Sequence, residues 1–170
     1  MFGWLRSRLR DREREREREG EMALSDHDII RVSGEYDPES VREISLDNMQ
    51  LISISAITKC VGLRSISLAN NMLHDLRAVA SLAELTSINA TGNRISTLED
   101  IKNLKNLRVL RVAGNALPQD FSELLQQLRP FRNLEELEIS TPTFPYQGWF
   151  ARYCAYARLV VTAGQRYFPR

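Results

Sequence analysis

The stretch LRSISLANNMLHDLRAVASLAELTSINATGNRISTLEDIKNLKNLRVLRVAGNALP, residues 63–118, repeats one pattern every 22 positions. An asparagine recurs at the same place in each unit, with apolar residues on both sides of it. The pattern comprises Leu63, Leu85 and Leu107, then Ile66, Ile88 and Leu110, then Asn71, Asn93 and Asn115, then Leu73, Ile95 and Leu117. One such unit cannot bury its own apolar side, so neighbouring units must stack to form a common core.

This pattern predicts a leucine-rich repeat solenoid of about five repeats, an α/β fold with short parallel strands on its concave side and a helical cap at each end. Side chains alternate along a strand, so the residues around Ile66 point in turn into the core and onto the concave surface. Each asparagine follows its strand, where its amide can bond backbone groups that would otherwise be buried without a partner. We therefore predict that Asn71, Asn93 and Asn115 form a structural ladder with no catalytic role.

Composition divides the chain into four segments. They are a charged Arg/Glu arm at 1–20, either disordered or helical, an N-terminal cap at 21–40, the repeats at 41–142, and a C-terminal cap and tail at 143–170. Within the N-terminal cap, Ser25 before two acids and Gly34 after them predict a short capped helix. The spacing from Leu107 to Leu134 exceeds the earlier spacing by five residues, and the extra segment FSELLQQLRP predicts a convex helix.

Composition also limits the classes of function. The chain has 23 basic and 22 acidic residues, so no overall field directs it to nucleic acid or to an anionic membrane. No apolar run approaches the roughly 18 residues of a membrane span. Cys60 and Cys154 are too few and too far apart to predict a disulfide framework or a metal cluster, which favours a reducing compartment. His27 and His74 form neither a triad nor a metal site in sequence, so we expect no enzyme activity, no metal and no cofactor.

Polar positions of the strands predict a partner-binding surface on the concave side. In register they form three rows, which are Glu43, Ser65, Ser87, Val109 and Glu136, then Ser45, Ser67, Asn89, Arg111 and Glu138, then Asp47, Ala69, Thr91, Ala113 and Ser140. The candidate contacts are Ser65, Ser67, Ser87, Asn89, Thr91, Val109, Arg111, Glu136 and Glu138. Small neutral residues at the centre let a partner approach closely, and acids at the margins can receive its basic groups. Two alternatives stay open: Arg111 either pairs with Glu136 or Glu138 or anchors a partner carboxylate, and the surface either binds or only faces water.

The arm MFGWLRSRLRDREREREREG, residues 1–20, contains seven arginines and five acids. Phe2 and Trp4 beside arginines are residue types that anchor interfaces, so we predict that this arm docks on a partner. The alternatives are contact with a membrane surface, an organelle-targeting start, and a solvated start with no role. Each arginine from Arg10 onward has an acid within a residue or two, which disfavours binding to phosphates of nucleic acid.

The units LRSISLANNMLHDLRAVASL, LTSINATGNRISTLEDIKNL and LRVLRVAGNALP resemble the 22-residue repeat subclass of protein phosphatase-1 regulators, axonemal dynein light chain 1 and the spliceosomal A-prime protein. Residues 22–165 also resemble small leucine-rich repeat-containing proteins of about this size. In particular, PYQGWFARYCAYARLVVTAG at 145–164 is similar to the C-terminal cap of that family, a helix followed by a short apolar strand.

The resemblance implies a non-enzymatic protein–protein interaction module, which is an adaptor or structural subunit of a larger assembly. It implies protein partners and a cytoplasmic location, with the cytoskeleton of cilia and flagella as the first assembly to test. One alternative is a subunit of an RNA–protein complex or a mitochondrial assembly, whose arginine-rich arm contacts nucleic acid. Another alternative is a phosphatase regulatory subunit.

Overall fold

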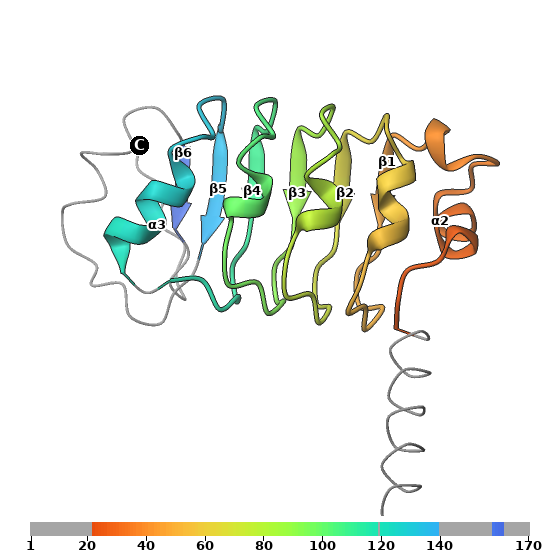
Figure 1. Cartoon of the computed structure of the whole chain (residues 1–170), viewed down its shortest axis with the longest axis horizontal. Helices are drawn as coiled ribbons and strands as arrows, with labels where there is room; N and C mark the ends of the chain where they lie inside the picture. Colours follow the sequence, from red (N-terminus) through yellow and green to blue (C-terminus); the bar gives the residue numbers. More distant parts are fainter. Residues whose placement is uncertain (1–21, 119, 140–157, 162–170) are drawn as a thin grey trace, which may run out of the picture.

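The computed structural model describes residues 22–118, 120–139 and 158–161 of the chain. Its strands form one parallel sheet in chain order (Figure 1). They are β1 (Glu43–Ser45), β2 (Ser65–Ser67), β3 (Ser87–Asn89), β4 (Val109–Arg111), β5 (Glu136–Ile139) and β6 (Arg158–Val161). The predicted arm at 1–20 and most of the predicted C-terminal cap lie outside the described residues.

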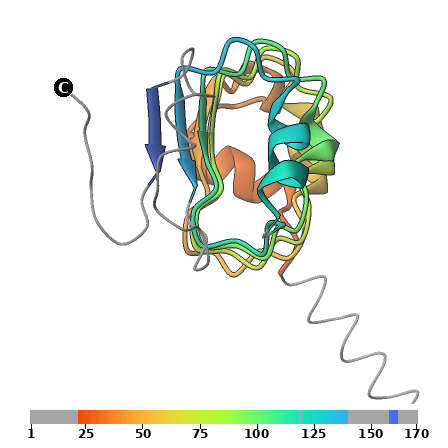
Figure 2. The same cartoon turned by 90° about the vertical axis from the view of Figure 1, so that its left-hand side faces the viewer.

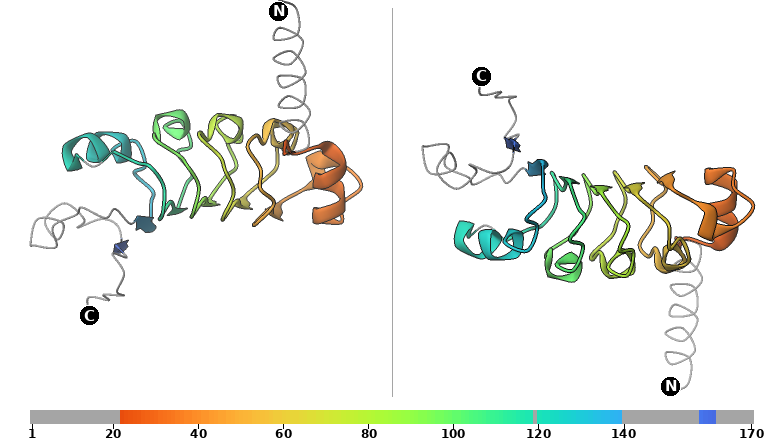
Figure 3. Two further views of the ribbon diagram at one scale, coloured as in Figure 1. Left: turned by 90° about the horizontal axis from the view of Figure 1, so that it is seen from below. Right: turned by 90° about the horizontal axis from the view of Figure 1, so that it is seen from above.

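Helical segments form the second layer, on the side of the core away from the sheet (Figures 2 and 3). Along the repeats they are the 3₁₀ turns η2 (Ser55–Lys59), η3 (Arg77–Val79) and η4 (Glu99–Ile101), then the helix α3 (Phe121–Leu128). The α-helix occurs where the sequence has five extra residues, as predicted. It begins at the cap Asp120, whose carboxylate accepts a hydrogen bond from the Ser122 amide at 2.8 Å.

The core lies between the two layers and repeats with the sequence. Strand register sets Ile44 beside Ile66, Ile66 beside Ile88, and Ile88 beside Leu110. All four side chains are buried, and so are the leucines that start the units, Leu63, Leu85 and Leu107. A 22-residue turn therefore returns each apolar residue next to its own equivalent, and the stacked units share one core.

The repeated asparagines lie where each chain turn leaves its strand. The Asn71 Nδ2 donates to the carbonyl oxygens of Leu46 at 2.8 Å and Leu68 at 2.9 Å, while its Oδ1 accepts from the amides of Met49 and Leu51. Asn93 and Asn115 repeat this geometry one and two turns later. Each asparagine thus hydrogen-bonds the backbone of its own turn and of the preceding one.

At the β1 end of the sheet, α2 (Asp26–Ser33) follows the predicted capping pattern. The Ser25 hydroxyl accepts from the Asp28 amide, the Asp28 carboxylate accepts from Ser25, and Gly34 ends the helix at φ +74°. The helix contacts β1 and buries Ile29 completely. The turn η1 (Pro38–Ser40) then leads into β1.

Candidate functional site: the concave sheet

Strand register brings two of the three predicted rows of polar positions together across the concave face. The first row runs Glu43, Ser65, Ser87, Val109, Glu136, and the second runs Ser45, Ser67, Asn89, Arg111, Glu138. Glu43 and Ser45 are exposed at the β1 margin, and the other members are half-buried. Thr91, also half-buried, follows β3. The predicted contacts Phe2 and Trp4 lie outside the described residues.

A continuous set of hydrogen bonds crosses the first half of this surface. The Asp47 Oδ1 accepts from the Ser67 hydroxyl and from the Ala69 amide, both at 2.6 Å, and its Oδ2 accepts from Ser45 at 3.1 Å. The Asn89 Nδ2 donates to the Ser67 hydroxyl at 3.0 Å, and its Oδ1 accepts from the Thr91 amide. These bonds hold the polar side chains of this half against the sheet.

Sequence reasoning missed the central role of Asp47 in this set. The available signal was the residue type. The position two residues before the repeated asparagine holds Ala69 and Thr91 in two units, and the equivalent position of the first unit holds Asp47. A carboxylate there reaches the next strand, because neighbouring strands are only about 4.8 Å apart.

Arg111 lies at the other half of the surface and pairs within the chain, one of the two predicted alternatives. Its Nε and Nη2 are both 2.8 Å from the Glu136 Oε1, and its Nε is 3.8 Å from the Glu138 Oε2. Two carboxylates therefore surround one guanidinium, and the Arg111 charge is compensated in place. This half of the surface presents a net acidic character despite its arginine.

Between these two halves the surface is small and uncharged. Among the described residues, the hydroxyl groups of Ser65 and Ser87 have no hydrogen-bond partner, and Val109 continues their row as a half-buried apolar side chain. Hydroxyl groups in this state can both donate to and accept from an incoming backbone. The centre can therefore contact a partner without first breaking internal bonds.

The described residues show no other constellation that indicates chemistry. No group of three or more His, Cys, Asp or Glu among them is arranged to hold a metal ion, and no described helix is long and apolar enough to cross a membrane. Cys60 is fully buried, and this burial, with the charges of Asp26 and Asp37, raises the pKa of its thiol to about 11. A thiol with that pKa stays protonated and is a poor nucleophile.

No protein-family model matches the sequence, and no curated protein matches it. Among solved structures, internalin C2 of Listeria monocytogenes strain 4b F2365 is similar, with a TM-score of 0.56 and 22% sequence identity over 73% of this chain and 52% of that one. Internalins are leucine-rich repeat proteins. This chain has a leucine-rich repeat fold. It spans about half the length of internalin C2. An internalin F structure from the same organism, at 22% identity, covers 56% of this chain and 33% of its own length with a TM-score of 0.46.

Proposed function

We propose that this chain is a non-enzymatic protein–protein interaction module that receives a basic segment of a partner protein on its concave sheet. The observation that carries the proposal is the charge of that face. From β1 to β5 it holds the carboxylates of Glu43, Asp47, Glu136 and Glu138 against the single guanidinium of Arg111. A surface of one sign speeds the approach of a segment of the other sign and disfavours wrong partners.

The positions of the carboxylates support this mode of binding. Glu43 is exposed at the β1 margin, whereas Glu136 and Glu138 lie at the β5 side, with the uncharged row of Ser65, Ser87 and Val109 between them. A segment lying across β1 to β5 meets acids at both ends of that stretch and small side chains in the middle, and beyond β5 the register places Arg158 of β6 beside Glu136. Its lysine or arginine side chains then pair at the margins while its backbone contacts the serine hydroxyls.

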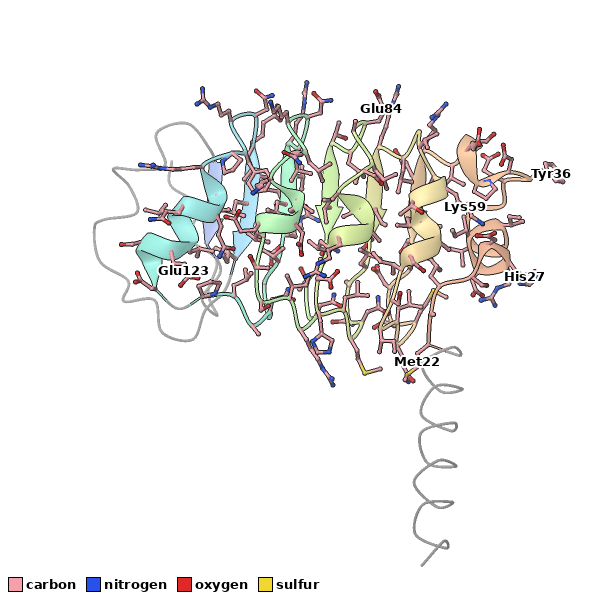
Figure 4. The ribbon with its side chains drawn as sticks, viewed as in Figure 1. Met22, His27, Tyr36, Lys59, Glu84 and Glu123 are labelled. Carbon is pink, nitrogen blue, oxygen red and sulfur yellow. The ribbon has the colours of Figure 1, made fainter. Side chains whose placement is uncertain are left out.

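We extend the proposal to the role and place of the protein. It acts as an adaptor or structural subunit of a larger cytoplasmic assembly, and its 22-residue repeats make cilia and flagella the first assembly to examine. The arm at 1–20 provides a second contact through Phe2 and Trp4, and α2 serves as the N-terminal cap. The arm precedes Met22 in the chain, and Figure 4 labels Met22 on one edge of the repeats. The Met22 carbonyl there accepts a hydrogen bond from the Ile52 amide at 3.0 Å.

The test is affinity capture with quantitative mass spectrometry on the full chain and on three variants. The margin variant, Glu43→Lys combined with Glu138→Lys, reverses the charge at both ends of the surface from β1 to β5. Glu123→Lys is the matched control, because Glu123 is exposed on the convex helix α3 (Figure 4). A third variant lacks residues 1–20, and thermal melting of each variant checks that the fold is retained.

We expect the margin variant to capture at least tenfold less of some partner that the Glu123→Lys protein still captures in full. Reconstitution with that partner, purified, must reproduce the loss and must show weaker binding as salt rises. If the margin variant and the control capture the same partners equally, the concave face is not the binding surface. Loss of partners only on deletion of 1–20 assigns recognition to the arm instead.

A further inference from the structure

A second surface lies on the edge where the chain enters the strands. Arg64, Thr86, Arg108 and Glu135 immediately precede β2, β3, β4 and β5, and they line one open groove of about 640 Å³ across these four turns. Figure 4 labels Glu84, which also lines the groove, on this edge, opposite the edge that carries Met22. The groove is therefore distinct from the concave face and from the point where the arm joins.

Short polar side chains in the groove are held by the backbone of the preceding turn. The Thr86 hydroxyl donates to the Arg64 carbonyl at 3.0 Å, and the Asn106 Nδ2 donates to the Ala83 carbonyl at 3.0 Å. The Asn133 Nδ2 donates to the Lys105 carbonyl at 2.8 Å. Because these side chains are committed to the chain itself, they keep the groove open and leave ligand contacts to the charged residues around them.

Charges in the groove are unequally compensated. The Arg108 Nη1 lies 3.3 Å from the Glu135 Oε1, and both of these side chains are more than half exposed. Arg64 and Arg132 are exposed, and neither forms an ion pair with any described residue. Because Arg64 precedes β2 and Arg132 lies in the turn before β5, two unpaired guanidinium groups belong to the first and last turns of the groove. A guanidinium presents a planar fork of donors that matches a carboxylate.

We propose that this groove binds an extended acidic segment of a partner protein, with carboxylates held by Arg64 and Arg132. The dimensions suit such a segment. Neighbouring strands are about 4.8 Å apart, so three intervals from β2 to β5 span about 14 Å. An extended chain rises about 3.3 Å per residue and returns to the same face every second residue, so acids at positions i and i+4 meet the two arginines. Glu84 opposes an acidic ligand and limits its affinity.

This inference is independent of the binding mode proposed for the concave sheet. The concave face is acidic and selects basic segments, whereas the groove has three arginines and two glutamates and selects acidic ones. The two surfaces also use different residues, so a variant of one leaves the other unchanged. Failure of either proposal is therefore distinguishable from failure of the other.

The test uses the full chain labelled with ¹⁵N and a hexaglutamate peptide as the probe, at low ionic strength. Side-chain amide signals of Asn106 and Asn133 report on the groove. The amide of Asn70 is the internal reference, because it lies after β2 on the opposite edge, where it donates to the Asn48 Oδ1 at 3.1 Å. Dissociation constants are then measured for Arg64→Gln, Arg132→Gln and Glu84→Gln. The matched control is Arg94→Gln, because Arg94 is an exposed arginine in the turn after β3.

We expect the signals of Asn106 and Asn133 to shift while that of Asn70 does not. Each of Arg64→Gln and Arg132→Gln should raise the dissociation constant about threefold to tenfold, Glu84→Gln should lower it, and Arg94→Gln should leave it unchanged. No shift at millimolar peptide, or an equal loss in Arg94→Gln, would overturn the proposal. An oligothymidine that shifts the Asn106 and Asn133 signals with a lower dissociation constant than hexaglutamate would also overturn the proposal, in favour of a nucleic-acid ligand.

Discussion

The asparagine ladder predicts an order of stability losses that differs from one repeat to the next. Replacing Asn71 by alanine removes the hydrogen-bond partner of three backbone groups, the amides of Met49 and Leu51 and the carbonyl of Leu46. Leu51 and Leu46 are buried, and Met49 is half-buried. An unpaired buried backbone group costs about 1–3 kcal/mol. We therefore expect Asn71→Ala to lower the free energy of unfolding by about 3–6 kcal/mol.

Asn93→Ala should cost less, although Asn93 is equally buried. The carbonyl of Leu68 accepts from both Asn71 and Asn93, and that of Ala90 accepts from both Asn93 and Asn115. Both carbonyls therefore keep a partner when Asn93 is lost, and only the Leu73 amide is left unpaired. We expect a loss of about 2–3 kcal/mol for Asn93→Ala. Asn115→Ala removes the partner of two groups, the Ile95 amide and the Val112 carbonyl, but Asn115 is half-buried and water can replace part of these bonds, so we expect a similar loss of about 2–3 kcal/mol.

The assay is urea unfolding followed by far-ultraviolet circular dichroism, with the free energy taken by linear extrapolation. Asn103→Ala is the control, since Asn103 is exposed and its side chain makes no hydrogen bond to any described residue; its effect should stay within about 0.5 kcal/mol. If Asn93→Ala destabilises the protein as much as Asn71→Ala, the sharing of carbonyls between neighbouring asparagines does not protect the fold. The reasoning from hydrogen-bond partners would then be wrong.

Three further predictions concern single positions. Gly92→Ala should lower the free energy of unfolding by about 1–2 kcal/mol in a urea titration, because Gly92 has φ +70° and a Cβ there lies 2.5 Å from the Asn70 Oδ1. Cys60 should react with a thiol reagent only as the protein unfolds, because burial raises the pKa of its thiol to about 11, and labelling in native buffer followed by peptide mapping checks this. The hydrogen bond from Ser25 lowers the pKa of the Asp28 carboxyl below its ordinary value of 3.8. The ionised Asp28 carboxylate therefore stabilises the fold fully above that ordinary pKa, and this stabilisation is lost as pH falls through the lower pKa of the folded protein. The difference in melting temperature between the native protein and Asp28→Ala should accordingly be full at neutral pH and vanish in acid.

Much of the fold follows from periodicity, which is a local property of the sequence. The 22-residue interval sets which apolar side chains become neighbours, and the sheet register from Ile66 to Ile88 and Leu110 confirms it. The extra residues before Leu134 are enough to convert a 3₁₀ turn into α3. Ser25 and Gly34 mark the ends of α2 because capping depends on residues within one turn of a helix.

The candidate surfaces depended on the tertiary structure, because they arise from side chains in different repeats. The spacing in sequence places Ser67 and Asp47 on one face, but the 2.6 Å bond between them requires the strands to stack in register and the carboxylate to lean across. The same holds for the two carboxylates that surround Arg111, and for the shared carbonyls of Leu68 and Ala90.

The sequence by itself thus determined the repeating core, the concave side and the positions of its polar rows, because burial of apolar residues follows their period. Only the tertiary structure decided which charges are compensated and which remain open to a partner. Arg111 is engaged by Glu136, whereas Arg64 and Arg132 come to line one groove although they lie far apart in the chain. Electrostatic compensation depends on distances of a few ångströms between repeats, and those distances exist only after the turns have stacked.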